Sequence, residues 1–589
     1  MPSWPCPVIG GSLIFDFAKL VWPEVIPAMI TTRARQPTWS PRPSEKGLVR
    51  LNPETVRPDP RTVVAGRADT YWDDSFAGGP IAGPFRPNWE SLKAYRIPDW
   101  FRDAKFGIWA HWSPQCVPEQ GDWYAHGMYV QGSSQYDYHV KTYGHPSRFG
   151  YKDICDLWRA EEWDPEELIR RYSKAGARYF VTLANHHGNF DCWDSKYQPW
   201  NSVNVGPKKD IVGTWEQIAR ANGLRFGVTY HGTPARVWRE FMPARYGADE
   251  TGALKGVAYD GVTTKTDGQG QWWEGMDPRD LNGPPHDKND PCPEFVEDFM
   301  LRVQDVIDTY NPDLLYFDDD CDWDFDDAAP FGRKLGVWLG MPELTPHIMA
   351  YYYNAAMRRA RGELDAVFTI KNVPSAVLGT LVRDFEMTQA SGIEPNPWQT
   401  DACIGAWHYD RSIHENHRYR TAQEMVHLLV DVVSKNGNLL LSIPLPGHGR
   451  PDEDELAFLD EFGAWMAVNG EAIYSSRPWK IPGEGPTGSG AVSLYGGSLP
   501  DFVSGDIRFT VRDGALYAIA LAWPDDGRLV IKSLASDSPH FRGDIVRIGL
   551  LGSRSDLTWS RDADGVTIDL PEQRPCDFAY AFKFTVSAL

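Results

Sequence analysis

The fold is decided by the stretch Asp313-Leu314-Leu315-Tyr316-Phe317-Asp318, which is followed at once by Asp319, Asp320, Cys321 and Asp322. A largely apolar run that leads into a cluster of acids is typical of a buried parallel strand whose C-terminal tip carries carboxylates. In a barrel of alternating strands and helices, catalytic groups lie at such tips. We therefore expect Asp318 to be a catalytic carboxylate at the end of a barrel strand.

The same alternation extends over residues 105 to 445. Apolar runs predict strands at 105–112, 177–184, 224–231, 313–318, 366–370, 381–387 and 438–443. Helical patterns lie between them, at 164–176, 211–221, 294–310, 348–362 and 421–437. A doubly wound sheet would alternate too, but no glycine-rich phosphate fingerprint follows the first strand. The pattern predicts an α/β fold with a (β/α)8-like, TIM-type catalytic barrel.

The composition and the hydrophobic pattern of the sequence change on both sides of the predicted barrel. Residues 1–90 are rich in Pro and Arg and predict an irregular lead-in, so that the barrel occupies 91–468. Residues 469–589 contain short alternating runs separated by turn signals, which predict a C-terminal antiparallel β-sandwich. The polar stretch 240–290 is too long for a plain connection and predicts either a lid over the site or a disordered insertion.

Composition narrows the classes of partner. The 589 residues carry a formal net charge of -21, which disfavours nucleic acid because such binding needs a basic face. The apolar run Val8 to Phe15 follows no basic residue and is soon interrupted, so it predicts neither a clear signal peptide nor a membrane span. The eight cysteines form no CxxC pair and fix neither compartment nor metal. The sequence allows a homo-oligomer without fixing the number of chains.

The acidic cluster at Asp318 also has a non-catalytic interpretation. The acidic run from Asp318 to Asp327 could be a solvated loop or a calcium site, but an EF-hand-type loop needs Gly at its sixth position and Glu at its twelfth. No start at Asp318, Asp320 or Asp322 meets this requirement. Cleavage of a glycosidic bond with retention needs two carboxyls about 5 Å apart, one ionised and one protonated. Asp318 suits the ionised role.

The pair His186-His187 raises the question of a metal. Neighbouring strand residues point to opposite faces, and there is no HExxH motif. No third candidate ligand lies at a spacing typical of a metal site. Hydrogen bonding to sugar hydroxyls is the functional interpretation, and two structural histidines are the alternative. We expect neither a metal nor a cofactor.

Several separated motifs together resemble the α-L-fucosidases of glycoside hydrolase family 29. The resemblance extends from about Trp100 to Trp479. Its motifs are Trp100-Phe101-Arg102-Asp103-Ala104-Lys105-Phe106-Gly107 with His111-Trp112; His186-His187; Asp194-Ser195-Lys196-Tyr197 with Trp200-Asn201-Ser202; Gly223-Leu224-Arg225-Phe226-Gly227; Tyr310-Asn311-Pro312-Asp313 through Phe317-Asp318; and Asn438-Leu439-Leu440-Leu441.

The resemblance implies an exo-acting, retaining hydrolase that releases α-L-fucosyl residues from a fucosylated oligosaccharide or glycoconjugate through a covalent intermediate. It implies Asp318 as the nucleophile. The implied substrate-binding residues are His111, Asp122, Trp123, His186, His187, Tyr230 and Tyr316. Many members have Glu-Trp where this chain has Asp122-Trp123, so a contact made by a longer acid is lost or remade. The resemblance also favours an extracytoplasmic location, periplasmic or secreted.

The position of the acid/base varies across that family. Glu386, at the tip of the run 383–386, is the first choice because it resembles the Glu-Arg-Gly motif of one bacterial subgroup, although Met387-Thr388 replaces Arg-Gly. Glu394, in the loop before Pro397, is the second choice. Two rival functions remain open: a fucose-binding protein on an inactive barrel, and an exo-glycosidase for another 6-deoxy or L-galacto-configured sugar.

Overall fold

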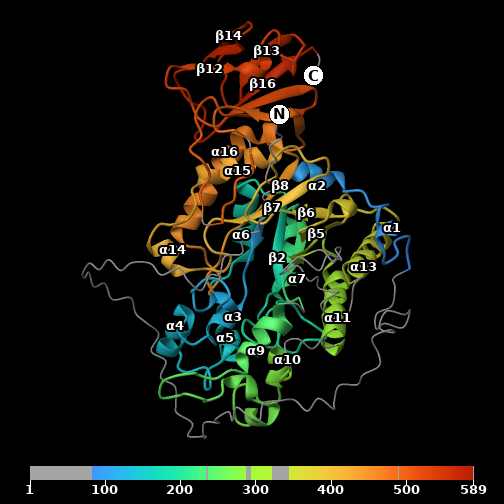
Figure 1. The fold of residues 1–589 in the computed structure, drawn as a ribbon, viewed down its shortest axis with the longest axis vertical. Coiled ribbons are helices and arrows are strands. Elements are labelled where there is room, and N and C mark those ends of the chain that lie inside the picture. The colour runs from blue at the N-terminus through green and yellow to red at the C-terminus, as the bar shows by residue number, and fades with distance from the viewer. Residues whose placement is uncertain are drawn as a thin grey trace, which may run out of the picture. The chain divides into compact units, whose positions relative to one another are not determined.

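Residues 106–442 contain a closed barrel of eight parallel strands that pair in the order of the sequence (Figure 1). The computed structural model describes residues 82–233, 236–286, 293–320, 344–488, 490–495 and 497–587. The strands are β1 (Phe106–Ala110), β2 (Tyr179–Asn185), β3 (Arg225–Tyr230), β4 (Leu314–Asp320), β5 (Val367–Lys371), β6 (Val382–Asp384), β7 (Trp398–Cys403) and β8 (Gly437–Ser442). Pairing of β8 with β1 closes the ring and confirms the predicted barrel.

Strand β7 is the one that the apolar pattern did not reveal. It is buried along its whole length, yet it carries the polar side chains of Gln399 and Asp401. Inside the barrel, Gln399 Nε2 donates to Asp384 Oδ2 at 2.7 Å, and Asp401 Oδ2 accepts from the Tyr316 hydroxyl at 2.9 Å. Because these polar groups satisfy one another, the strand is buried without the continuous apolar run typical of parallel strands.

Helices connect the strands and cover the outside of the barrel, with α11 and α13 side by side along one flank (Figure 1). The long helices are α6 (Pro165–Lys174), α7 (Ile211–Ala221), α11 (Pro293–Tyr310), α13 (Leu344–Arg359), α15 (Ala422–Ser434) and α16 (Glu453–Ile473). Shorter ones are α1 (Trp89–Leu92), α2 (Asp99–Ala104), α3 (Tyr124–Gly127), α4 (Ser134–Thr142), α5 (Tyr151–Leu157), α9 (Met242–Arg245), α10 (Pro278–Asn282) and α14 (Arg411–Glu415). Helix α15 begins with the predicted capping box, in which the Thr421 side chain accepts from Glu424 N.

Two apolar layers lie on the two sides of the barrel strands. The inner layer includes Trp109, Tyr179, Leu314, Tyr316 and Leu440. The outer layer fills the space between the strands and the helices. Successive residues of a strand therefore contribute to different layers, and the face on which a residue lies decides whether it can reach the barrel interior.

The long polar stretch is an ordered insertion over its described part, residues 236–286. It contains α9, α10 and two 3-10 turns, Asp260–Val262 and Lys265–Gly268. Buried polar contacts tie it to helices α4 and α5: Tyr136 donates to Asp249 Oδ1 at 2.5 Å, and Lys152 Nζ donates to Asp260 Oδ2 at 3.1 Å. These contacts exclude the disordered alternative for the described residues.

The C-terminal region consists of two antiparallel sheets that share one apolar core, as predicted. Its strands are β9 (Arg477–Glu484), β10 (Ile507–Arg512), β11 (Ala515–Ala520), β12 (Arg528–Ile531), β13 (Ile545–Leu550), β14 (Thr558–Arg561), β15 (Val566–Asp569) and β16 (Tyr580–Val586). Buried contacts join it to the barrel helices, since Arg508 Nε donates to Asp431 Oδ1 at 2.6 Å and Trp465 Nε1 donates to Ala579 O at 2.8 Å. The two regions therefore share a packed polar interface.

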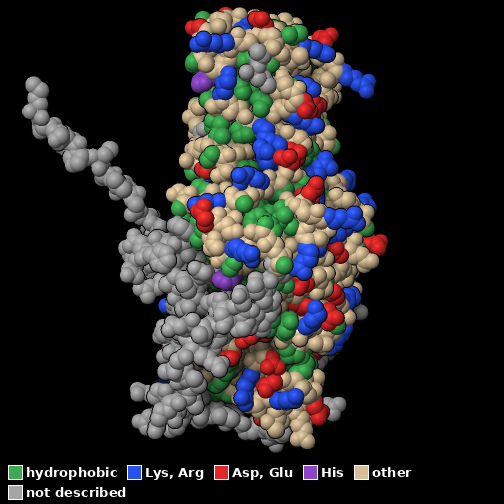
Figure 2. All heavy atoms as spheres, turned by 90° about the vertical axis from the view of Figure 1, so that its right-hand side faces the viewer, with side chains coloured by type: hydrophobic (Ala, Val, Ile, Leu, Met, Phe, Trp, Pro, Cys, Tyr) green, Lys and Arg blue, Asp and Glu red, His purple; other side chains and the backbone are tan. Residues whose placement is uncertain are grey.

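Most of the predicted lead-in, residues 1–81, lies outside the described residues, as does the acidic run beyond Asp320. Among the helices that the structure describes, none combines the length and the apolar character needed to span a bilayer. On the face shown in Figure 2, acidic and basic side chains are interspersed.

Candidate active site

Asp318 lies near the C-terminal end of β4, and groups from the two neighbouring strands contact its carboxylate. His231, which directly follows β3, donates from Nδ1 to Asp318 Oδ2 at 2.8 Å. Lys371, the last residue of β5, pairs its ammonium with Asp318 Oδ1. His187 Nε2 lies 3.8 Å from Oδ2. The carboxylate is thus held on both oxygens at the edge of the barrel where catalytic groups are expected.

This environment fixes the charge of Asp318. Burial alone would raise the pKa of its carboxyl, but the Lys371 ammonium, the His231 hydrogen bond and the Arg236 guanidinium together bring that pKa well below its usual value. Asp318 is therefore ionised throughout the neutral range. An ionised carboxylate is the form that attacks an anomeric carbon.

Lys371 also contacts a second carboxyl. Its ammonium donates to Glu386 Oε2, and Glu386 follows β6, the next strand around the barrel. Because one nitrogen contacts both carboxylates, their facing oxygens lie within the span of two hydrogen bonds, at most about 5–6 Å. That spacing is typical of the carboxyl pair of retaining glycosidases. The structure thus brings the predicted nucleophile and the first-choice acid/base together.

Glu394 is at the other end of the barrel. Its backbone N–H donates to Lys435 O at 3.2 Å, immediately before β8 begins, and its carboxylate pairs with Arg383 at 2.8 Å. All eight strands run parallel, so the start of β8 lies at the edge opposite to the tip of β4. This corrects the second-choice prediction, because a carboxylate there cannot reach a bond held at Asp318.

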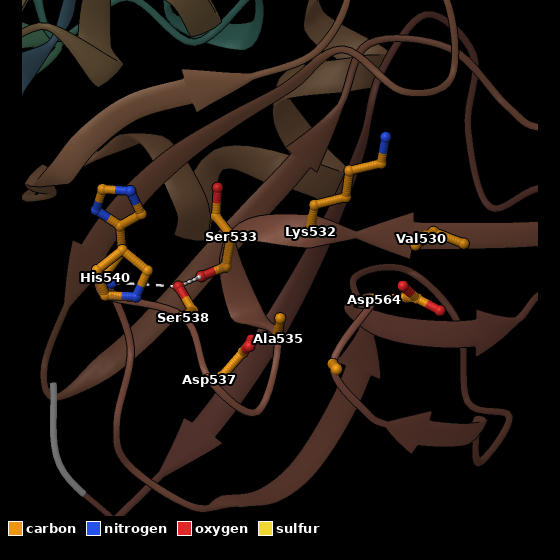
Figure 3. A pocket seen from close by; sticks show the side chains of 10 residues that line it. Val530, Lys532, Ser533, Ala535, Asp537, Ser538, His540 and Asp564 are labelled. Carbon is orange, nitrogen blue, oxygen red and sulfur yellow. Dashed lines mark hydrogen bonds between the residues drawn. The ribbon is translucent and has the colours of Figure 1, made fainter.

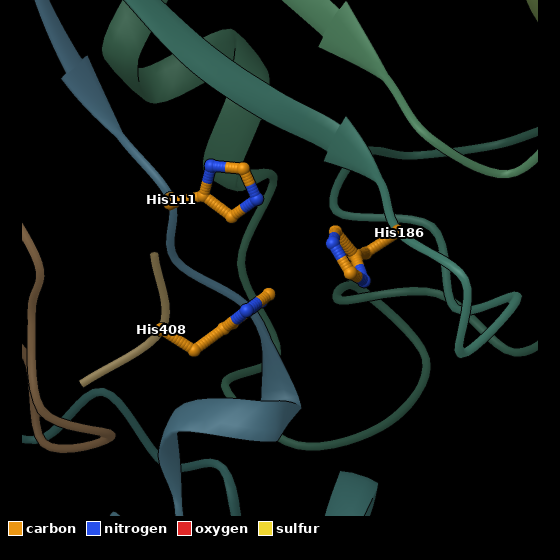
Figure 4. Close-up of side chains that lie close together, drawn as sticks. All are labelled: His111, His186 and His408. Carbon is orange, nitrogen blue, oxygen red and sulfur yellow. The ribbon is translucent and has the colours of Figure 1, made fainter. Parts of the chain in front are cut away.

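A group of buried histidines lies beside the carboxyl pair and is called the histidine floor: His111, His186, His187, His231 and His408. Figure 4 shows His111, His186 and His408 converging from three separate segments of the chain. The His111 ring centroid lies 5.3 Å from that of His186, 4.9 Å from that of His408 and 4.8 Å from that of His231. His187 completes the group, with its ring centroid 4.2 Å from that of His186. The predicted histidines His111, His186 and His187 are therefore neighbours in space.

The expectation that His186 and His187 point to opposite faces is wrong. Strand β2 ends at Asn185, so both residues belong to the loop that follows it. Alternation of side chains holds only within the extended strand. Beyond it, the chain turns through Asn189, whose φ of 63° is left-handed, and both rings face the site.

The partners of these rings indicate which nitrogen carries a proton. Gln115 Oε1 accepts from Ala125 N at 3.1 Å, so the Gln115 amide donates from Nε2 to His186 Nδ1 at 2.7 Å. His186 therefore presents an N–H at Nε2. His187 donates from Nδ1 to His231 O at 2.6 Å and presents a lone pair at Nε2.

Two sets of three histidines are close enough to hold a metal ion, with ligand atoms within 4.8 Å: His111, His186 and His408, and His186, His187 and His231. In the first set, both His408 nitrogens already have partners, Asp122 at 3.1 Å and Ser113 Oγ at 3.0 Å. Both sets contain His186, whose free nitrogen is a donor in this hydrogen-bond network. Neither set offers three lone pairs, so the donors and acceptors fit sugar hydroxyls better than a metal.

These rings are kept neutral. Burial lowers the pKa of His111, His186 and His187 well below the ordinary value, and the neighbouring rings contribute to the shift. Two buried nitrogens, His111 Nδ1 and His231 Nε2, have no hydrogen-bond partner among the described residues. An unpartnered polar atom in a buried site is costly unless a ligand satisfies it. The site is therefore prepared for a hydroxyl-rich ligand.

Asp122 and Trp123 have different tasks. The Asp122 carboxylate accepts from the backbone N–H of Trp407 at 3.1 Å and of His408 at 2.7 Å, so it fixes the loop that carries His408. Trp123 has a left-handed backbone with φ 65° and an exposed fraction of 37%. Its ring lies edge-on to His187, with centroids 5.9 Å apart. Trp123 is thus an aromatic wall beside the histidines.

The two predicted tyrosines lie on opposite sides of the barrel wall. Tyr316 belongs to the inner layer, beneath the site, and donates to Asp401. Tyr230 belongs to the outer layer, where its ring packs against Phe299 of α11 with centroids 5.3 Å apart. The prediction that Tyr230 lines the pocket is therefore wrong, because its neighbour His231 is the residue whose side chain faces Asp318.

Several site residues were not selected from the sequence: His231, Lys371, His408 and Arg236. A signal existed for two of them, since His231 ends the predicted strand 224–231 and Lys371 directly follows the predicted strand 366–370. Strand-tip position could have selected both. His408 lies in a loop and Arg236 lies at the start of the π-helical turn Val237–Phe241, and nothing in the local pattern marks either residue.

Comparison with known protein families identifies the family to which this chain belongs. Residues 80–471 match the family described as Alpha-L-fucosidase, and residues 500–585 match the Alpha-L-fucosidase C-terminal domain. The chain belongs to the alpha-L-fucosidase family. It is accordingly a glycoside hydrolase.

Similar proteins cover most of this fucosidase. Tissue alpha-L-fucosidase of Rattus norvegicus is 27% identical over 521 residues, which is 87% of this chain and 94% of the relative. The human tissue enzyme is also 27% identical, over 85% of this chain and 92% of its own. Among solved structures, Thermotoga maritima alpha-fucosidase aligns with a TM-score of 0.62 at 25% identity, covering 85% of this chain and all of the other.

A surface hollow of about 780 Å³ lies in the C-terminal region of this fucosidase, apart from the catalytic groups (Figure 3). Its lining mixes polar and apolar side chains: Val530, Lys532, Ser533, Ala535, Asp537, Ser538, Pro539, His540, Ala563 and Asp564. Within this lining, Ser538 Oγ donates to Ser533 O at 2.6 Å. It shares no residue with the site, which we therefore define by the residues around Asp318.

Proposed function

We propose that this fucosidase releases terminal α-L-fucosyl residues from fucosylated oligosaccharides or glycoconjugates with retention of configuration, using Asp318 as nucleophile and Glu386 as acid/base. One observation carries the proposal. A single ammonium, that of Lys371, contacts both carboxylates and so sets a separation suited to double displacement.

In the first step, an Asp318 oxygen attacks the anomeric carbon while Glu386 gives its proton to the departing glycosidic oxygen. This forms a fucosyl ester and leaves Glu386 ionised. In the second step, Glu386 takes a proton from water, the water oxygen attacks the anomeric carbon, and the ester bond to Asp318 breaks. Two inversions give net retention.

The histidine floor fits the hydroxyl face of the sugar. His186 offers an N–H, and His187 and His231 offer lone pairs at Nε2, so one hydroxyl can accept from the first and another can donate to the others. The ring of Trp123 offers apolar surface for the methyl group that fucose carries in place of a hydroxymethyl. Each polar contact that strengthens in the transition state contributes to rate.

The test is release of nitrophenol from 4-nitrophenyl α-L-fucoside by the wild type and by Asp318→Ala. We expect turnover by the wild type and a loss of at least about 10⁴-fold in the variant. Azide should partly restore activity and yield a fucosyl azide, because a small anion fills the place of the lost carboxylate. A folded Asp318→Ala protein with near-normal turnover would remove Asp318 from the nucleophile role.

A further inference from the structure

A segment of the C-terminal region reaches the acid/base. The chain between β9 and β10 runs onto the barrel, where Leu494 N donates to Met387 O at 2.7 Å. Met387 is the residue that follows Glu386. Arg420 Nη2 donates to Leu494 O at 2.8 Å from the other side. Leu494 is 1% exposed and belongs to the outer core of the barrel, so its position is firmly held.

The next residue, Tyr495, is thereby carried to Glu386. Its hydroxyl lies close enough to the Glu386 carboxylate and to the Lys371 ammonium for both charges to act on it. Burial first, and then the charge of Glu386, raises the pKa of the Tyr495 hydroxyl, which therefore stays protonated as the donor. The side chain as a whole is 51% exposed, so much of its surface faces solvent beside the site.

We propose that Tyr495 forms the leaving-group side of the active site, orienting Glu386 with its hydroxyl and offering its ring to the departing sugar or aryl group. The inference rests on the proposed role of Glu386. A general acid must lie beside the glycosidic oxygen, so a half-exposed aromatic side chain next to Glu386 lies where the leaving group departs. The β9–β10 connection of the C-terminal region thus takes part in substrate choice.

The hydroxyl has a specific chemical consequence. As Glu386 gives up its proton, negative charge develops on its carboxyl, and a hydrogen bond from Tyr495 stabilises that charge. The benefit is greatest when proton transfer is most advanced, which is the case for poor leaving groups. Tyr495 is a positioning residue in this respect, since it acts on the reacting atoms through Glu386.

The experiment compares Tyr495→Phe and Tyr495→Ala with wild type on 4-nitrophenyl α-L-fucoside and on a fucosylated oligosaccharide. We expect Tyr495→Phe to lower kcat/KM on the oligosaccharide by roughly tenfold, the worth of one hydrogen bond to a charged group, and on the aryl substrate by less than about threefold. The basic limb of its pH profile should move to higher pH, because the ionised acid loses a donor. Tyr495→Ala should in addition raise KM for the oligosaccharide.

A matched control is Tyr197→Phe. Tyr197 is 43% exposed on the loop after β2, next to the Lys196–Asp305 ion pair on the outside of the barrel, and should behave as wild type. A thermal midpoint near that of wild type establishes that Tyr495→Phe is folded, and the Phe comparison stands even if the Ala variant is not.

The outcomes separate the two proposals. An active wild type whose Tyr495→Phe variant matches it on both substrates and in pH profile overturns the role of Tyr495 alone. A wild type that is folded but inactive on both substrates overturns the proposed function and this inference with it. In a Glu386→Ala background, adding Tyr495→Phe should cost nothing further on the oligosaccharide; a full additional loss would show that the hydroxyl does not act through Glu386.

Discussion

The barrel holds two pairs of carboxyl groups, and they differ in what surrounds them. The upper pair, Asp318 and Glu386, shares the Lys371 ammonium, and the pKa of Asp318 lies well below its usual value. The lower pair, Asp384 and Asp401, is inside the barrel, where the two carboxyls interact with each other. Burial, with the neighbouring carboxyl contributing for Asp401, raises the pKa of Asp384 to about 7 and that of Asp401 well above its usual value.

The comparison shows that direct contact with a cation decides whether a buried carboxyl group is ionised. Each lower carboxyl has one oxygen without a partner among the described residues, Asp384 Oδ1 and Asp401 Oδ1. One proton shared between the two carboxyls would give both oxygens a partner. The same residue type thus stays ionised at the rim and keeps its proton to a higher pH a few residues deeper.

The largest expected effect comes from making the upper pair resemble the lower one. In Lys371→Met, the two carboxyls lose their common cation, so proton sharing becomes favourable and Asp318 is no longer ionised throughout the neutral range. We expect kcat/KM on the aryl fucoside to fall by roughly 10²–10⁴-fold, with the acidic limb of the pH profile moved to higher pH.

Lys371→Arg is the matched control, because it keeps the charge and should retain more activity than Lys371→Met. An unchanged acidic limb in Lys371→Met would mean that the histidines, rather than the ammonium, keep Asp318 ionised.

The second effect separates the two acid candidates. Glu386→Ala should slow a substrate with a sugar leaving group by about 10²–10⁴-fold and an activated aryl fucoside far less, because nitrophenol departs without protonation. Glu394→Ala, at the opposite end of the barrel, should leave both rates near those of wild type. Equal slowing of both substrates by Glu386→Ala would point to another acid.

The third prediction concerns the lower pair and pH. In the folded protein the pKa of Asp384 is about 7, against about 3.9 for an unfolded chain. The folded state therefore binds more protons between these values, and the free energy of unfolding falls as pH rises from about 4 to about 7. Asp384→Asn removes this titration, so its thermal midpoint should fall less than that of wild type between pH 5 and pH 8. Parallel curves for the two proteins would show that the pair does not share a proton.

The smallest expected effect is that of Tyr316→Phe. It removes the donor to Asp401 Oδ2 from the inner layer and should cost about 1–2 kcal/mol of unfolding free energy. Because Tyr316 lies beneath the site, activity should fall only by about two- to fivefold. A loss comparable to that of Lys371→Met would instead place the hydroxyl in direct contact with substrate. The measurements are a denaturant titration and aryl fucoside turnover.

The sequence by itself determined the barrel, the C-terminal sheets, Asp318 and the histidines at strand tips. These rest on local signals: apolar runs, caps such as that of Thr421, and polar residues where a strand ends. The sequence pattern did not predict strand β7 because Gln399 and Asp401 interrupt its apolar run. Only their hydrogen-bond partners on β6 and β4 make these polar side chains compatible with burial.

Only the tertiary structure decided which side chains meet. It placed Tyr230 outside the barrel wall and His231 inside, separated Glu394 from Asp318, and brought Lys371 between the two acids. It also carried Tyr495 from the C-terminal region to Glu386. The physical reason is that local pattern fixes which residues are extended or helical, whereas the face a residue occupies and its distant partners depend on strand closure and on packing between segments far apart in the chain.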